Sequence, residues 1–126
     1  MSVVGIGTDI IEISRLAKMK NAALDKLALR VLTPTEHQHY LQLKFKMPYL
    51  AKRWAGKEAA AKALGTGIAA GVSFQHFEIQ SLASGQPILL LSHIALEKAK
   101  LLGATSWHIS LSDEKEYATA FVVLSE

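Results

Sequence analysis

A glutamate between two lysines is the first feature of this sequence that could do chemistry. Glu58 is flanked by Lys57 and Lys62 in the segment RWAGKEAAAKALGTG, residues 53–67. Alanine, lysine and glutamate are strong helix formers, so a stiff helix is the simplest interpretation. Apolar residues also recur along one side of the segment: Trp54, Ala55, Ala59, Ala63 and Leu64. This pattern predicts a helix packed against a core, with its charges at the edge of a buried surface.

A second carboxylate, Asp9, stands at the end of a predicted strand. It follows Gly5 and Gly7, which allow another group to approach the backbone closely. Asp9 also precedes a predicted helix, and an aspartate there caps a helix well, so a simple cap is one interpretation. The other is that Asp9 meets Glu58, since Mg²⁺ typically takes one or two protein carboxylates and completes its shell with waters and phosphates. In that arrangement the two lysines beside Glu58 are placed to hold phosphate oxygens.

Positive charge gathers in one part of the chain. Residues 15–62 hold eleven of the fourteen Lys and Arg residues and three of the eleven acidic ones, so this segment carries +8 and the remainder −5. Such polarity predicts an anionic partner. Arg15, Lys18 and Lys26 fall on one face of a predicted helix over residues 12–32. That face is either simply solvated or a docking surface for an acidic protein.

Near the carboxyl end, the segment HISLS, residues 108–112, alternates strictly between polar and apolar residues. In a strand this spacing places His108, Ser110 and Ser112 on one face and Ile109 and Leu111 on the other. The polar face is either an ordinary solvent-facing surface or a face that binds phosphates or hydroxyls beside the site.

The elements that must position these residues indicate an α+β protein with helices early and strands late. A chain of 126 residues fits one domain, residues 1–126. The expected elements, in chain order, are a strand over 3–9, a helix over 12–32, a short helix after the capping box at 33–36, a third helix over 48–64, strands over 74–82 and 88–91, a helix over 94–102, and a hairpin of strands 107–112 and 117–124.

Composition excludes several classes of function. The sequence has no cysteine, which rules out disulfides, thiolate nucleophiles and cysteine metal sites and fits a reducing compartment. No apolar run approaches the ~20 residues that span a membrane, and the first residues lack the basic start of a signal peptide. A cytoplasmic protein is therefore expected.

Three segments together resemble a known family. GIGTDIIEISR near the start, RWAGKEAAAKALGTGI in the middle and HISLSDEKEYATAFVV near the end are similar to the holo-[acyl-carrier-protein] synthases, the small bacterial class of 4′-phosphopantetheinyl transferases. The similarity runs nearly end to end and includes RVLTPTEHQHY. One position departs from the family: many members have His where Asp113 stands, so no role is assigned to Asp113.

The resemblance implies the family's fold, an antiparallel sheet with helices packed on it, and its reaction. A 4′-phosphopantetheine group passes from coenzyme A to a serine hydroxyl of apo-acyl carrier protein in fatty acid biosynthesis, with Mg²⁺ as cofactor and adenosine 3′,5′-bisphosphate as product. The residues that match the family's functional positions are Asp9 and Glu58 for the metal, Arg53, Lys57 and Lys62 for the coenzyme A phosphates, His108 in the active-site strand, and Arg15 for the carrier protein. Lys62 would also steady the departing bisphosphate. The resemblance further implies a homotrimer with coenzyme A in clefts between subunits.

Two other functions compete with this one. A basic nucleic-acid-binding module without catalysis would explain the +8 segment equally well, although the segment lacks the glycine-aromatic stacking motifs of RNA-binding domains and any basic tail. A transferase that modifies a different carrier protein is the second. We prefer the synthase function that the resemblance implies, and we expect neither a nucleic acid nor a membrane as partner.

Overall fold

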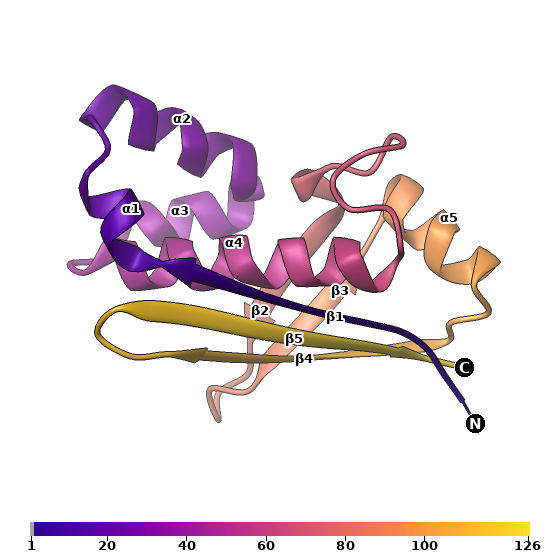
Figure 1. The fold of residues 1–126 in the computed structure, drawn as a ribbon. Helices are drawn as coiled ribbons and strands as arrows, with labels where there is room; N and C mark the ends of the chain where they lie inside the picture. Colours follow the sequence, from indigo (N-terminus) through magenta and orange to yellow (C-terminus); the bar gives the residue numbers. More distant parts are fainter. Residues whose placement is uncertain (1) are drawn as a thin grey trace.

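The computed structural model describes residues 2–126 and shows one long helix lying along an antiparallel sheet (Figure 1). The elements are β1 (Val3–Glu12), α1 (Ile13–Ala17), α2 (Asn21–Val31), α3 (Pro34–Gln42), α4 (Lys46–Ala63), the 3₁₀ turn η1 (Phe74–His76), β2 (Phe77–Ser81), β3 (Pro87–Leu91), α5 (His93–Leu101), β4 (Ser106–Asp113) and β5 (Tyr117–Ser125). The α+β class predicted from the sequence is confirmed. Among residues 2–126, no helix combines the length and apolar character that crossing a bilayer requires.

The strands form two separate antiparallel sheets. Strands β1, β5 and β4 make a three-stranded sheet in that order, and β2 pairs with β3 in a two-stranded one. The β4–β5 hairpin confirms the predicted one, and β5 in turn pairs with β1, so strands from the two ends of the chain lie side by side. In Figure 1, α4 lies along the three-stranded sheet, α1 follows the end of β1, and α2 lies on the side of α4 away from the sheet.

Strand β1 contacts α4 almost backbone to backbone. A Cβ atom added at Gly7 would overlap the carbonyl oxygen of Ala59, and one at Gly5 would overlap the carbonyl oxygen of Ala63. Glycine on the strand and alanine on the helix are therefore both required for this approach. Side chains alternate along a strand, so the face that carries the two glycines also carries Asp9.

The inner face of the sheet and α4 enclose the core. Alternate residues of β5 are fully or almost fully buried against the helix: Ala118, Ala120, Val122 and Leu124. Alanines of α4 meet them, with Ala51, Ala55 and Ala59 having no exposed surface. The apolar face predicted for this segment is thus the face that packs on the sheet.

The expected helix over residues 12–32 is wrong. Strand β1 continues to Glu12, because Ile10, Ile11 and Glu12 pair with β5. Cross-strand pairing overrides the local helical pattern there. The rest divides into α1 and α2, since Lys20 has an extended backbone conformation before α2 begins. Figure 1 shows the two helices separated by this bend.

Smaller differences concern where other elements begin. The capping box of Thr33 and Glu36 is confirmed, and α4 ends just before Gly65, which has a positive φ of 81°. Helix α4 begins at Lys46 rather than at Pro48, which is its third residue. The strand expected over residues 74–82 starts with the turn η1, so only its second half is β2.

Candidate active site

Asp9, Glu58 and Lys62 lie together where β1 passes over α4. The Lys62 ammonium donates hydrogen bonds of 3.0 Å to a carboxylate oxygen of Asp9 and of 3.0 Å to the backbone oxygen of Thr8. The side chain of Lys62 is about half exposed, whereas that of Asp9 is mostly buried. The glycine positions of β1 bring Asp9 this close to the helix, and Glu58 lies one turn before Lys62 on the same helical face.

The two carboxylates repel each other. Partial burial raises the pKa of Glu58, and the negative charge of Asp9 raises it further. Lys62, Arg30 and a hydrogen bond from Trp54 act in the opposite direction on that pKa. Two like charges in a partly desolvated place favour the binding of a cation that interacts with both of them.

These donors fit a hard divalent cation. Carboxylate oxygens are the ligands that Mg²⁺ prefers, and it usually takes only one or two from a protein. Within residues 2–126, no group of three or more histidine or acidic side chains is arranged to hold a metal. A cation bound by Asp9 and Glu58 would therefore complete its shell with waters and substrate oxygens, which suits a catalytic ion better than a structural one.

Lys57, which the resemblance places near the coenzyme A phosphates, faces the interior of this chain. Lys57 has no exposed surface, and its ammonium donates to a carboxylate oxygen of Glu36 at 2.5 Å and to the backbone oxygen of Val31 at 2.6 Å. Burial lowers the pKa of Lys57, while Glu36 acts to raise it. Adjacent helical residues point about 100° apart, so Lys57 faces the interior while Glu58 faces β1.

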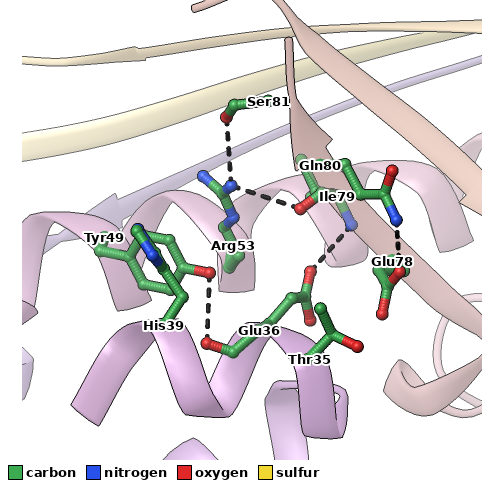
Figure 2. A pocket seen from close by; sticks show the side chains of 9 residues that line it. All are labelled: Thr35, Glu36, His39, Tyr49, Arg53, Glu78, Ile79, Gln80 and Ser81. Carbon is green, nitrogen blue, oxygen red and sulfur yellow. Dashed lines mark hydrogen bonds between the residues drawn. The ribbon is translucent and has the colours of Figure 1, made fainter. Parts of the chain in front are cut away.

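Arg53 lies in a cavity on another side of α4 (Figure 2). The cavity has a volume of about 270 Å³ and is lined by Thr35, Glu36, His39, Tyr49, Arg53, Glu78, Ile79, Gln80 and Ser81. Arg53 is 8% exposed, and its guanidinium lies 4.3 Å from the centroid of the Tyr49 ring. It donates to the backbone oxygen of Ile79 at 3.3 Å and to the Ser81 hydroxyl at 3.5 Å. Among residues 2–126, no group accepts a hydrogen bond from its Nε.

Arg53 and Glu58 do not share one surface of this chain. They are five residues apart on α4, which separates them by about 140° around the helix axis. The two groups assigned to one ligand from the sequence therefore face different directions.

His108 also lies away from Asp9. It is exposed, as are Ser110 and Ser112, while Ile109 and Leu111 are partly buried, so the predicted alternation is present. Asp9 is on the opposite face of the sheet, since it pairs with the buried Ala120. We call the exposed side the outer sheet face; it consists of Ile6, Thr8, Ile10, His108, Ser110, Ser112 and Phe121.

The three basic residues expected on one helical face belong to two elements. Arg15 is on α1, Lys18 is the first residue after α1, and Lys26 is on α2. All three are exposed. The single helical stripe is therefore wrong as geometry. Arg15 nevertheless lies close to the site, because its guanidinium is 5.3 Å from the Trp54 ring centroid.

Two residues near Glu58 were missed by the sequence reasoning. Trp54 precedes Glu58 by four residues, so helical spacing alone could have placed it beside the carboxylate. Arg30 reaches the site from α2, and no local pattern predicts such a long-range approach. Asp113, to which no role was assigned, forms a 3.0 Å ion pair with Lys52 of α4.

Known proteins with similar sequence and structure cover almost the whole chain. The model of the 4′-phosphopantetheinyl transferase superfamily matches residues 5–122. The holo-[acyl-carrier-protein] synthase of Yersinia enterocolitica is 48% identical over 124 residues, 98% of each chain. The structure of the synthase from Neisseria meningitidis superposes with a TM-score of 0.88 at 39% identity, covering 99% of this chain and 100% of that one. The synthase of Bacillus anthracis, solved in complex with CoA (3′,5′-ADP), gives a TM-score of 0.81 at 40% identity, covering 97% and 96%.

Proposed function

The chain belongs to the 4′-phosphopantetheinyl transferase superfamily, and we propose that it acts as a holo-[acyl-carrier-protein] synthase. It transfers the 4′-phosphopantetheine group of coenzyme A to a serine hydroxyl of apo-acyl carrier protein and releases adenosine 3′,5′-bisphosphate. The observation that carries this proposal is the junction of Asp9, Glu58 and Lys62, a pair of carboxylates with a cation beside them, in a chain that matches such synthases over nearly its full length.

The carboxylates would hold Mg²⁺. Their mutual repulsion, which raises the pKa of Glu58, supports this assignment, as does their hard oxygen chemistry. When bound, the ion neutralises charge on the diphosphate of coenzyme A, which is the main requirement of phosphoryl transfer.

The residues of this chain position the reactants and handle the proton. The serine oxygen attacks the phosphorus that carries the pantetheine arm, and the bond from that phosphorus to the oxygen of the departing bisphosphate breaks. Lys62 is half exposed and reaches the carboxylates, so it is placed to compensate the negative charge that develops on the leaving group. Asp9 and Glu58 are basic groups at the site that can receive the serine proton, directly or through a water.

A homotrimer is part of the proposal. Arg53, His108 and the Asp9–Glu58 pair face three different directions on one chain, so one ligand can meet all of them only if another copy contributes. The outer sheet face supports this, because Ile6 is 61%, Ile10 59% and Phe121 46% exposed. An apolar face of this kind on a sheet is typical of a surface that another chain covers. In such an assembly, His108 and the cavity of Arg53 would take the phosphates of a coenzyme A bound at a neighbouring carboxylate pair.

The nucleic-acid alternative is weakened by the burial of two basic residues. Arg53 and Lys57 are two of the eleven Lys and Arg residues of residues 15–62, and both are buried. The positive surface available to a polyanion is smaller than the sequence suggests.

We also propose that residues 1–126 act as one transferase domain, and the absence of cysteine supports the expected cytoplasmic location.

A mass measurement tests the proposed function. Apo-acyl carrier protein is incubated with the chain, coenzyme A and Mg²⁺, and the carrier protein is then weighed by mass spectrometry. We expect a gain equal to one phosphopantetheine group, which disappears when EDTA is added. An unchanged carrier mass with a folded chain would refute the proposal, and a gain on other carrier proteins but not on this one would favour a transferase of different specificity.

A further inference from the structure

Glu36 links three elements from inside the protein. One carboxylate oxygen accepts hydrogen bonds from the Thr33 amide at 2.8 Å and from the Lys57 ammonium at 2.5 Å. The other accepts a 2.8 Å bond from the amide of Ile79 in β2, which Figure 2 shows. Glu36 is 3% exposed and Lys57 not at all. The pair therefore fixes α4 to the start of α3 and to the two-stranded sheet.

The contact of α4 with β1 does not by itself define the position of the helix along that strand. This contact is made by Ala59 and Ala63 against glycines, and Ala55 is one further turn back along the same row. A shift by one helical turn would thus replace one alanine with another. Packing of this kind is close but smooth, since interlocking large side chains are what normally specify a single arrangement.

A buried ion pair is well suited to define that position. Buried charged groups contribute little net stability compared with apolar residues of the same shape, but in some proteins they select one register among several. Lys57 is the residue immediately before Glu58 and is one turn after Arg53. Any rotation or sliding of α4 that displaces Lys57 from Glu36 also displaces Glu58 from Asp9.

We propose that the Glu36–Lys57 pair positions the active site by setting the register of α4, so that Glu58 meets Asp9 in the geometry that binds the metal. Both are positioning residues in this proposal, because they are buried and bonded to each other, whereas Asp9 and Glu58 would hold the metal. The inference rests on the proposed function, in which Asp9 and Glu58 are the metal ligands.

The double variant Glu36→Gln/Lys57→Met tests this role. It removes both charges and nearly keeps the volumes, and such apolar replacements of buried pairs are often well tolerated by the fold. Mn²⁺ is used as the probe, its binding followed by electron paramagnetic resonance in the presence of coenzyme A, at a temperature where circular dichroism shows the variant folded. We expect the dissociation constant for Mn²⁺ to rise roughly 10- to 100-fold, the loss typical of removing the support of a metal ligand. We also expect kcat to fall while KM for acyl carrier protein stays unchanged.

A second ion pair on the same helix provides the matched control. Lys52→Met/Asp113→Asn also removes two charges that join α4 to a strand, but this pair is partly exposed, whereas the Glu36–Lys57 pair is buried. We expect its Mn²⁺ affinity to equal that of the wild type. A folded Glu36→Gln/Lys57→Met variant with wild-type Mn²⁺ affinity and kcat would overturn the proposal.

The outcome stays decisive if the double variant does not fold. Glu36→Asp then keeps both charges and shortens the carboxylate arm by one methylene; weaker Mn²⁺ binding in the folded variant supports the proposal, and unchanged binding overturns it. Loss of the fold in both variants overturns it as well, because the pair is then required for folding rather than for register. A wild-type chain that binds no Mn²⁺ overturns the proposed function itself, and this inference with it.

Discussion

Lys57 and Lys62 are five residues apart on one helix and have opposite surroundings. Lys57 is buried against Glu36, whereas Lys62 is half exposed beside Asp9. The difference arises from direction alone, since five residues turn the helix by about 140°. The first lysine is committed to an internal carboxylate. Only the second is free to move towards a phosphate when a ligand and a metal change the charge at Asp9.

Replacing Lys62 tests its proposed contact with the leaving group. We expect Lys62→Ala to lower kcat/KM for coenzyme A by about 10²–10³-fold, the effect of losing one preorganised charge-stabilising donor. Lys62→Arg should restore part of this at most, since a planar guanidinium and a compact ammonium differ in reach and geometry. Lys52→Ala, on the same helix, should have little effect. Steady-state kinetics for Lys62→Ala equal to those of the wild type would leave Lys62 only as the ion-pair partner of Asp9.

The ionised Glu58 carboxylate should lower the stability of the metal-free protein at neutral pH. Its pKa is raised in the folded state, chiefly by burial and then by Asp9, so the folded protein binds this proton more tightly than the unfolded chain. The stability that protonation contributes is complete below the unfolded pKa of about 4.3 and is lost as pH rises through the higher folded pKa.

Thermal melts of Glu58→Gln in EDTA test this consequence. The amide stays neutral, so we expect the variant to have a higher Tm than the wild type at pH 7 and the difference to shrink as pH falls towards 4. Adding Mg²⁺ should raise the Tm of the wild type and leave that of the variant nearly unchanged. A lower Tm for the variant at pH 7 in EDTA would contradict the electrostatic account of the site.

At the scale of elements, the contact of β1 with α4 creates the site. Asp9 is on the strand and Glu58 on the helix, and they meet because Gly5 and Gly7 leave no side chains between the two backbones. Packing therefore requires this spacing of the two glycines and Asp9. Alternate residues of a strand share one face, so all three face the helix.

Gly7→Ala should separate the strand from the helix. Its Cβ would overlap the backbone oxygen of Ala59, and backbone cannot move aside as a flexible side chain can. We expect a loss of about 1–3 kcal/mol in the free energy of unfolding, typical of overpacking, together with weaker Mg²⁺ binding. Val3→Ala, on the same strand but exposed, should change stability by no more than about 0.5 kcal/mol. Denaturant titrations of both variants measure the comparison, and equal stabilities would argue against the close contact.

Local signals in the sequence predicted those elements whose boundaries depend on nearby residues. The capping box at Thr33 and Glu36 and the hairpin near the carboxyl end were found because their patterns are complete within a few residues. The division into α1 and α2 was missed, since the extension of β1 to Glu12 depends on pairing with β5, a strand more than a hundred residues later in the chain.

In the candidate site, too, local patterns did not predict contacts between residues far apart in the chain. Asp9, Glu58 and Lys62 could be selected from residue type and spacing, together with family resemblance. The burial of Lys57 could not, because its partner Glu36 already had a sufficient local explanation as a helix cap. Only the packed structure shows that one carboxylate serves both as cap and as counterion.

At the scale of the whole molecule, the outer sheet face should determine assembly. Phe121→Lys places a charge at its middle, opposite Thr8 and Ser110 in the strand register. We expect the variant to be monomeric in light scattering after size-exclusion chromatography and to lose most transfer activity, although Asp9, Glu58 and Lys62 are unchanged. Leu101→Lys, an equally drastic change at an exposed residue of α5, should leave the assembly intact. A wild-type chain that is itself monomeric and active would refute the shared site.

We expect docking of the carrier protein to depend on charge at the carboxyl end of α1. The resemblance implies an acidic carrier protein as partner. Arg15 and Lys18 are exposed, and Arg15 lies over the ring of Trp54, which influences the pKa of Glu58. Complementary charge steers the encounter of two proteins, and salt screens it over a Debye length of about 10 Å at 0.1 M. A carrier protein held there would present its serine towards the carboxylates.

Reversing these charges should separate docking from chemistry. We expect Arg15→Glu/Lys18→Glu to raise KM for acyl carrier protein and to flatten its dependence on salt, while KM for coenzyme A hardly changes because Lys62 and Arg53 are untouched. Lys98→Glu/Lys100→Glu on α5 makes the same change in net charge far along the chain, so it separates local docking from overall charge. Lys26→Glu, on α2, reports whether the docking surface extends beyond α1. Both KM values are measured at low and high salt. A carrier-protein KM that responds equally to the α1 and α5 reversals would assign the effect to net charge and leave Arg15 and Lys18 as solvated surface residues.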